Sequence, residues 1–233
     1  MPVFQLDERL IFPPPTVAEE DGLLAVGGDL QPRRLLLAYS QGIFPWPHDD
    51  MPLMWFSPDP RMVLTPDEAR VSRSLRARLR RGEYEVTLDR AFPEVVAACA
   101  DTPRGDQDGT WITDDIAAAY GRLHELGLAH SVETWHEGRL VGGLYGLSLG
   151  RAFFGESMFS RRSDASKVAF VTLSRQLVAW DFAFIDCQVP SEHLASLGAR
   201  EWPRQRYLDA LHDAVRQPTR QGPWELERAA CAG

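Results

Sequence analysis

Two short apolar stretches of the sequence each contain a carboxylate that could take part in chemistry. Glu156 interrupts FFGESMFS, and Asp186 interrupts FIDCQV, which also contains Gln188. Both stretches are predicted strands, and alternate residues of a strand share a face, so Asp186 and Gln188 should point together. If the two strands are neighbours, two carboxylates and an amide meet in one apolar-walled pocket. Buried unpaired carboxylates are costly, so such a cluster requires a cationic partner.

The cationic partner has two possible sources. Arg161 and Arg162 follow the first stretch directly and could neutralise the carboxylates in structural ion pairs. Alternatively, a bound ligand carries the positive charge, and the sequence leaves both possibilities open. The two-residue period of a strand also places Met158 and Ser160 on the same face as Glu156.

Nucleophilic and metal chemistry have weaker support in the sequence. Ser157 in GESMF does not match the G-x-S-x-G nucleophile elbow. Cys187 follows Asp186, whose charge would raise the pKa of the thiol, so a buried small hydrophobe is the default interpretation. The three cysteines (Cys99, Cys187 and Cys231) show no CxxC spacing, and the six histidines form no HxxxH or HxH pair. We therefore expect no metal, no cofactor and a reducing cytoplasmic location.

Composition bounds the class of protein. The chain has 233 residues, of which 44% are hydrophobic and 25% charged, as is ordinary for a globular enzyme. The longest apolar runs are too short to span a bilayer, so we expect no membrane partner. A net charge of −8 argues against non-specific binding of nucleic acid, with one local exception.

That exception is ARVSRSLRARLRR, residues 69–81, which holds six arginines and no acid. One interpretation is an ordinary solvated helix face. The other is a phosphate-binding strip, because each guanidinium offers a planar fork of donors to phosphate oxygens. The arginines are Arg70, Arg73, Arg76, Arg78, Arg80 and Arg81.

Turn signals and periodicity predict the elements that must position these residues. The first sixty residues, rich in Pro and Gly, surround one helix over 32–42 and suggest a small α/β unit. A later helix over 113–126, capped by Thr113, leads into a three-stranded antiparallel meander. A long helix capped by Asp164, an apolar strand and two shorter helices follow. The order β-β-β-α-β-α predicts a mixed sheet with helices on its faces, while the last dozen residues are expected to fray.

Two aromatic residues accompany the helix over 113–126. Trp111 lies just before it, and Tyr120 lies two turns along it. Such aromatics usually pack in the core, although one near a helix start can also stack on a base.

Over most of its length, the sequence resembles the leucyl/phenylalanyl-tRNA–protein transferase family. The resemblance runs from about residue 22 to 208 and rests on GLLAVGGDL, RLLLAYSQGIFPW, WFSPDPR, GTWIT, YGRLHELGLAHSVE, LVGGLYG, GESMFSR, IDCQV and HLASLGA. It implies transfer of Leu or Phe, and less readily Met, from aminoacyl-tRNA to the N-terminal Arg or Lys of acceptor proteins, which marks them for N-degron degradation. It also implies an α+β fold in which a small N-terminal α/β domain, residues 1–62, precedes a GNAT-like acyltransferase domain with a mixed sheet, residues 63–233.

The resemblance assigns a role to each matching position at the reacting centre. Asp186 and Gln188 occupy the catalytic segment, and Glu156 lies in the pocket that faces the acceptor. We expect Asp186 to orient Gln188, the Gln188 amide oxygen to accept a hydrogen bond from the attacking amine, and Glu156 to hold the acceptor's positive charge. The expected lining of the aminoacyl pocket is Leu144, Met158, Ser160, Phe170, Leu173 and Ile185.

For the tRNA, the resemblance implies contacts at two places. Trp111 and Tyr120 would hold the terminal adenosine, together with Ser191, which stands where the family has asparagine. The acceptor stem would lie on the arginine-rich helix, at Arg73, Arg76 and Arg80.

Three alternatives stay open from the sequence. An acetyl-CoA acetyltransferase of the same fold usually carries R-x-x-G-x-G/A before its central helix, whereas SRRSDASK here contains no glycine. A non-catalytic RNA-binding module would leave the paired acids structural. Transfer of amino acids from tRNA to cell-wall precursors differs only in the acceptor.

Overall fold

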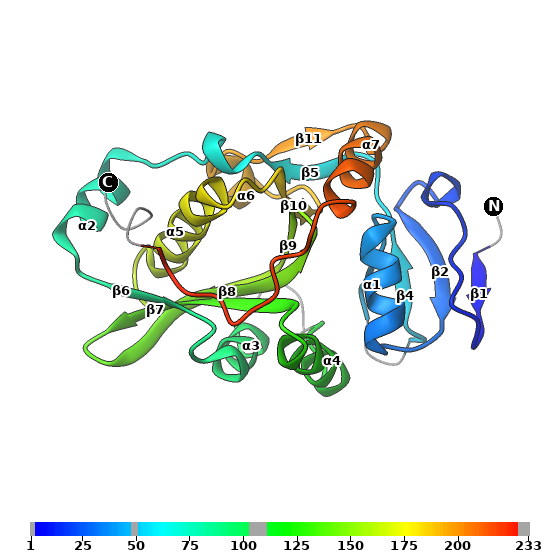
Figure 1. Ribbon diagram of the computed structural model, residues 1–233, viewed down its shortest axis with the longest axis horizontal. Helices are drawn as coiled ribbons and strands as arrows, with labels where there is room; N and C mark the ends of the chain where they lie inside the picture. The colour runs from blue at the N-terminus through cyan, green and yellow to red at the C-terminus, as the bar shows by residue number, and fades with distance from the viewer. Residues whose placement is uncertain (1–2, 48–50, 103–110, 228–233) are drawn as a thin grey trace.

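The computed structural model describes residues 3–47, 51–102 and 111–227, whose strands form two sheets (Figure 1). The smaller, four-stranded sheet has the order β1-β2-β4-β3 and belongs to the N-terminal part of the chain. Its strands are β1 (Phe4–Leu6), β2 (Leu23–Gly27), β3 (Phe44–Pro45) and β4 (Met54–Phe56). A single helix, α1 (Pro32–Ser40), covers it and begins with proline, as the sequence predicts.

The larger sheet contains seven strands. They are β5 (Arg61–Leu64), β6 (Glu85–Leu88), β7 (Ala129–His136), β8 (Arg139–Leu149), β9 (Ala152–Ser160), β10 (Phe184–Gln188) and β11 (Arg200–Trp202). Their order is β11-β5-β10-β9-β8-β7-β6, and only β9 and β10 pair in parallel. The sheet is therefore mixed, and the α+β fold class is confirmed.

The predicted meander is present as β7, β8 and β9. Glu137 and Gly138 form its first turn with φ of 51° and 74°, and Gly150 forms the second with φ of 58°. The edge strand β11 was not predicted. β5 begins at Arg61, so the last two residues of the expected N-terminal domain already pair within the larger sheet.

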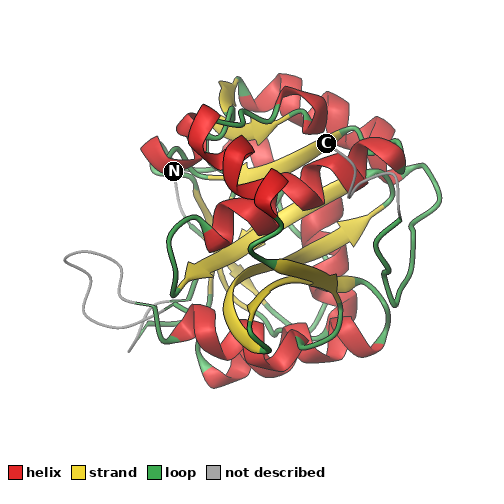
Figure 2. Ribbon diagram, turned by 90° about the vertical axis from the view of Figure 1, so that its left-hand side faces the viewer, coloured by secondary structure: helices red, strands yellow, loops and turns green. Residues whose placement is uncertain are grey.

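Helices cover both faces of the larger sheet. Figure 1 shows α5 on one side of it and α3 and α4 on the other, and the turned view of Figure 2 shows strands layered between helices. The helices are α2 (Arg73–Arg81), α3 (Phe92–Ala100), α4 (Asp114–Glu125), α5 (Ala165–Ala179), α6 (Glu192–Ser196) and α7 (Arg204–Val215), and two 3-10 helices lie at Pro15–Val17 and Pro66–Glu68. None of the helices within the described ranges combines the length and hydropathy needed to cross a membrane.

Two local expectations are corrected. Thr113 caps α4 through the N–H of Ile116, as predicted, but the Asp164 side chain does not cap α5. Asp164 has a left-handed backbone, with φ of 62°, and its carboxylate binds Arg78 instead. The final described residues are not frayed, because Trp224 is buried in a second core cluster under α5, which also contains Phe153, Leu173 and Phe182. Residues 228–233 lie outside the described ranges.

One core cluster joins the two sheets. It contains Tyr39 of α1, Phe44 of β3, Tyr120 of α4 and Phe154 of β9, all buried. The N-terminal part therefore forms one wall of the space beside β9 and β10.

Candidate active site

A bulge in β9 sets the position of Glu156. Tyr145 of β8 lies opposite Ser157 and Gly146 lies opposite Gly155, so Glu156 is the extra residue on the bulged strand. The bulge resets the alternation of side chains along β9. The expectation that Glu156 shares a face with the next two even-numbered residues is therefore wrong.

Met158 and Ser160, which follow the bulge, lie in different surroundings. Met158 packs against the second core cluster, which lies under α5. Ser160 is exposed at the end of β9, where its hydroxyl donates to the carbonyl of Arg162. Ser160 does not line the apolar cavity, and its assignment to the aminoacyl pocket is corrected.

The strands β9 and β10 pair only as far as Phe154 and Asp186. Beyond that point the register of β10 shifts, and Gln188 adopts a left-handed backbone with φ of 63°. The Gln188 Nε2 donates to Glu156 Oε1 across the gap, at 3.1 Å. The parting of the two strands leaves a cavity between β8, β9, β10 and α5.

This cavity has a volume of about 430 Å³. Five of the six predicted aminoacyl-pocket residues line it, namely Leu144, Met158, Phe170, Leu173 and Ile185. The structure adds Phe153 and Cys187 to the apolar lining, and Phe44, Pro45 and Trp46 contribute a wall from the N-terminal part. Volume and lining fit a pocket for one apolar side chain and its attachment.

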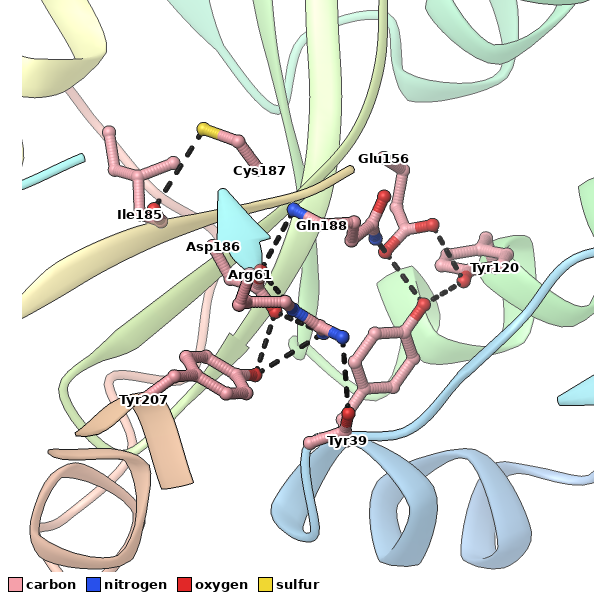
Figure 3. Close-up of polar contacts among 10 residues, drawn as sticks. Tyr39, Arg61, Tyr120, Glu156, Ile185, Asp186, Cys187, Gln188 and Tyr207 are labelled. Atoms are coloured by element: carbon pink, nitrogen blue, oxygen red, sulfur yellow. Dashed lines mark hydrogen bonds and ion pairs between the residues drawn. The ribbon is translucent and has the colours of Figure 1, made fainter. Parts of the chain in front are cut away.

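Glu156 lies at the edge of the cavity, where it is buried and its hydrogen-bond donors are all neutral (Figure 3). The Tyr39 hydroxyl donates to Oε1 at 2.6 Å and the Tyr120 hydroxyl to Oε2 at 3.0 Å, and the two hydroxyl oxygens also contact each other. Each hydroxyl has one proton, so when both donate to an ionised Glu156 neither donates to the other. Burial raises the pKa of Glu156 to about 7, although both hydroxyls and Gln188 oppose the shift. Among the described residues, no cation pairs with Glu156, and no other carboxylate lines the cavity.

Asp186 lies in a different environment on the neighbouring strand. Arg61 binds both of its oxygens, with Nε to Oδ1 at 2.8 Å and a terminal nitrogen to Oδ2 at 2.7 Å. The Tyr207 hydroxyl donates to Oδ2 at 2.8 Å, and the Gln188 N–H donates to Oδ1 at 2.9 Å. Asp186 is wholly buried and does not line the cavity.

The arginines expected to neutralise these carboxylates do not do so. The Arg161 guanidinium lies over the Phe159 ring, 5.4 Å from its centroid, and Arg162 contacts His136. Both are exposed. The protein's own cation is Arg61, and it neutralises Asp186 alone.

Sequence reasoning missed Arg61, Tyr39 and Tyr207. The sequence contains a weak indication for Arg61 and for Tyr39. Arg61 is a charged residue at the head of the apolar run RMVL, and Tyr39 carries a hydroxyl within the apolar helix RLLLAYS. No local pattern reveals which distant carboxylate such groups meet.

Cys187 is a buried residue of the lining rather than a nucleophile. Burial raises the pKa of its thiol, and the Asp186 charge raises it further. The group therefore stays protonated and apolar, in agreement with the interpretation from sequence.

Two of the three residues expected to hold the end of the tRNA line the cavity, and the third does not. Trp111 and Ser191 line the cavity and are partly exposed. Tyr120 is fully buried, with a hydroxyl committed to Glu156, so its ring offers no surface on which a base could stack. Its place in the structure is that of a donor to Glu156.

The arginine-rich segment forms α2 after a Ser72 cap that accepts from the N–H of Leu75. Arg73, Arg76 and Arg80 are exposed, and the described residues include no ion pair with any of them. Arg78 is structural, since it binds Glu83 and Asp164. In the part of the chain that the structure describes, no group of three His, Cys, Asp or Glu residues could hold a metal ion.

Comparison with known sequences gives the family. A family model described as leucyl/phenylalanyl-tRNA protein transferase matches residues 63–212, and one for the N-terminal domain of that transferase matches residues 28–59. A leucyl/phenylalanyl-tRNA–protein transferase of Myxococcus xanthus is 55% identical and covers 99% of this chain and 99% of its own length. Another, from Nitrosospira multiformis, is 59% identical and covers 94% of this chain and 95% of its own length.

Two solved structures resemble part of the chain weakly. A GCN5-related N-acetyltransferase from Kribbella flavida superposes with a TM-score of 0.38 and 9% identity, over 73% of this chain and 60% of that chain. L-PGS from Bacillus licheniformis also gives a TM-score of 0.38, with 10% identity, over 72% and 54%. Scores this low carry no functional conclusion.

The matches extend over nearly the whole chain, and they place the cavity, Glu156 and Gln188 inside the matched region. The chain is therefore an enzyme of the aminoacyltransferase class. It belongs to the leucyl/phenylalanyl-tRNA–protein transferase family.

Proposed function

We propose that this enzyme transfers Leu or Phe, and less readily Met, from aminoacyl-tRNA to the N-terminal Arg or Lys of acceptor proteins, and so marks them for N-degron degradation. The observation that carries the proposal is Glu156. It is a buried carboxylate at the edge of an apolar cavity, beside Gln188 and without a cation among the described residues.

The apolar part of the cavity would hold the side chain of the transferred amino acid. Its lining residues are large and flexible or aromatic, as suits Leu, Phe and Met better than β-branched side chains. An apolar pocket discriminates one methylene by only about 1–3 kcal/mol, so some transfer of similar residues is expected.

Glu156 would hold the positive charge of the acceptor. A buried carboxylate with only neutral donors gains more from an incoming cation than one that is already paired. The pKa of Glu156 is raised to about 7, so part of the carboxyl is protonated near neutral pH. An approaching cation favours the ionised form of Glu156 and so strengthens its own binding.

Gln188 would orient the attacking amine. Because its Nε2 donates to Glu156, its amide oxygen is left to accept a hydrogen bond from the α-amine. The amine nitrogen forms a bond to the ester carbonyl carbon, the bond to the ribose oxygen breaks, and the proton lost by the amine balances the one gained by the ribose hydroxyl. An α-amine has a pKa of about 7.7–8.0, so positioning, worth roughly 7–11 kcal/mol, can supply most of the acceleration.

The tRNA would be held at the cavity mouth and on α2. Trp111 and Ser191 remain our candidates for the terminal adenosine, since both are accessible in the lining. Exposed Arg73, Arg76 and Arg80 would contact the acceptor stem. We place the enzyme in the cytoplasm, where the buried thiols of Cys99 and Cys187 would stay reduced.

The direct test is incubation of the enzyme with Leu-tRNA and a peptide that begins with Arg, followed by mass measurement. We expect the peptide to gain one leucyl residue at its N-terminus. The same peptide with an acetylated N-terminus, and one that begins with Glu, should gain none. Absence of transfer to the Arg peptide contradicts the proposal, and acetylation in a parallel reaction with acetyl-CoA would favour the acetyltransferase alternative.

The position of the acceptor stem is tested by the salt dependence of tRNA affinity. The affinity for tRNA falls as salt rises. Replacing Arg76 and Arg80 by Ala should make this dependence less steep, by about 1 in the slope of log affinity against log salt for each phosphate that the variant no longer binds. Arg9→Ala is the matched control, because Arg9 is exposed on the N-terminal segment, where it pairs with Asp7. If the slopes of the α2 variants equal that of the control, the stem does not lie on α2.

A further inference from the structure

Arg61 is a buried arginine that contacts three separate parts of the chain. It opens β5 and has no exposed surface. Besides its two bonds to Asp186 of β10, a terminal nitrogen donates to the carbonyl of Gly42 at 3.2 Å, and another lies 3.3 Å from the Tyr207 hydroxyl of α7. The Phe44 and Tyr207 rings lie on its guanidinium, with centroids at 4.7 and 4.6 Å.

The contact with Asp186 leads to Gln188. The Asp186 Oδ1 that Arg61 holds also accepts the backbone N–H of Gln188. Gln188 is a non-glycine residue in the left-handed region, a conformation that costs free energy and persists only when surrounding contacts hold it. Asp186 supplies such a contact, and it can do so only while its own carboxylate is fixed.

The contact with Gly42 leads to the opposite wall of the cavity. Gly42 ends the α1 segment and is followed by Phe44, Pro45 and Trp46, all of which line the cavity. A Cβ at Gly42 would lie 2.8 Å from Tyr207 Cε1, so α1 and α7 meet closely there. The position of this wall is therefore tied to Arg61 and its neighbours.

We propose that Arg61 is a positioning residue for transfer: through Asp186 it fixes the backbone of Gln188, and through Gly42 it fixes the facing cavity wall. The inference deepens the proposed function and rests on it. Arg61 touches neither substrate, and Asp186 acts only through Gln188. Four donors already occupy the two oxygens of Asp186 (Figure 3). The Asp186 carboxylate therefore has no role as acceptor of the amine's proton.

The first test is Arg61→Lys, with kinetics of Leu transfer to the Arg peptide. A lysine keeps the charge but loses the planar fork that holds both Asp186 oxygens and the Gly42 carbonyl. We expect kcat per folded molecule to fall roughly 10–100-fold, since small misplacement of a reacting group has effects of this size. The KM for aminoacyl-tRNA should change less than kcat, because the exposed arginines of α2 and the part of the cavity lined by β8 and α5 are untouched.

Arg34→Lys is the matched control. Arg34 is equally buried, and it binds Asp29 and the carbonyls of Asp7 and Arg9, none of which lines the cavity. It should lower stability without lowering kcat per folded molecule. If Arg61→Lys and Arg34→Lys behave alike, Arg61 is merely structural and the proposal is overturned.

A second variant guards against loss of the fold. Arg61→Met combined with Asp186→Leu removes both buried charges, an exchange that is often neutral or stabilising. We expect a folded protein whose kcat remains at least about tenfold below wild type, because nothing then anchors the Gln188 backbone. Wild-type kcat in this variant overturns the proposal. If the wild-type enzyme itself fails to modify the Arg peptide, the proposed function fails, and the two failures are thus distinguishable.

Discussion

The two buried carboxylates of this enzyme lie on adjacent strands yet have opposite surroundings. Asp186 of β10 receives a guanidinium on both oxygens and has no exposed surface. Glu156 of β9 receives two tyrosine hydroxyls and one amide, all neutral, and lies at the edge of the cavity. Asp186 accepts four hydrogen bonds and Glu156 three, so the main difference between them is the cation beside Asp186.

This difference indicates which carboxylate is structural and which is available for a ligand. A neutralised pair has little to gain from a further charge, so Asp186 serves to hold backbone. Neutral donors solvate Glu156 in the interior without satisfying its charge, and the energetic cost of its ionisation can be offset by a bound cation. The same side-chain chemistry thus takes two roles because of its surroundings.

The largest expected effect on stability comes from breaking the ion pair between Arg61 and Asp186. Asp186→Asn leaves the buried Arg61 without a counter-charge, which typically destabilises a protein by about 3–5 kcal/mol. The corresponding change Glu156→Gln removes a buried charge and strands none, so it should leave stability at pH 8 equal or higher. Urea unfolding of the two variants measures the contrast, and equal losses would show that the two environments do not differ as described.

The pH dependence of stability is the next effect in size. Burial raises the folded-state pKa of Glu156 from 4.5 to about 7, so its contribution to stability is fully present below pH 4.5 and is lost as pH rises through 7. At 1.36 kcal/mol for each pKa unit, the loss is about 3 kcal/mol. We expect the free energy of unfolding of wild type, relative to Glu156→Gln, to fall by this amount between pH 4 and pH 8. A flat difference would mean that Glu156 has an ordinary pKa.

The third effect concerns transfer itself. A hydrogen bond to a charged group is worth about 1.5–3 kcal/mol, so Glu156→Gln should lower kcat/KM for the Arg peptide roughly 10–150-fold. Affinity for tRNA, measured on the same variant, is the control and should stay at the wild-type value. Wild-type transfer by Glu156→Gln would remove Glu156 as the residue that holds the acceptor.

Local patterns in the sequence predicted much of this architecture. Periodicity and caps located α4 and the meander, because both depend on neighbours within a few residues. They also placed Glu156 beside Gln188, since two strands that flank one crossover helix are usually adjacent. The expectation that Asp186 shares their pocket was wrong, because Asp186 is buried with Arg61 and does not line the cavity. Five of the six lining residues followed from the family resemblance.

What the sequence did not predict depends on distant contacts or on one irregular residue. The ion pair of Arg61 with Asp186 joins residues 125 positions apart, and no local signal selects it over Arg161 or Arg162. The bulge at Glu156 separates the face of Glu156 from that of Met158 and Ser160, and Ser160 misses the cavity because it lies at the exposed end of β9. Tyr120 was interpreted as a surface for a base because its burial depends on α1 and β9, far away in the chain.

The smallest predicted effect compares one hydroxyl from each environment. Tyr39→Phe removes a donor that lowers the pKa of Glu156, so that pKa should rise further and the pH of half-maximal kcat/KM should move upward. A hydrogen bond of about 0.5–1.5 kcal/mol corresponds to a shift of roughly 0.4–1 pH unit. Tyr207→Phe removes a donor to Asp186, which keeps its ion pair with Arg61 and does not line the cavity, so its profile should keep the wild-type midpoint. Equal shifts in both variants would mean that the midpoint does not report Glu156, and the division of roles between the two carboxylates would not hold.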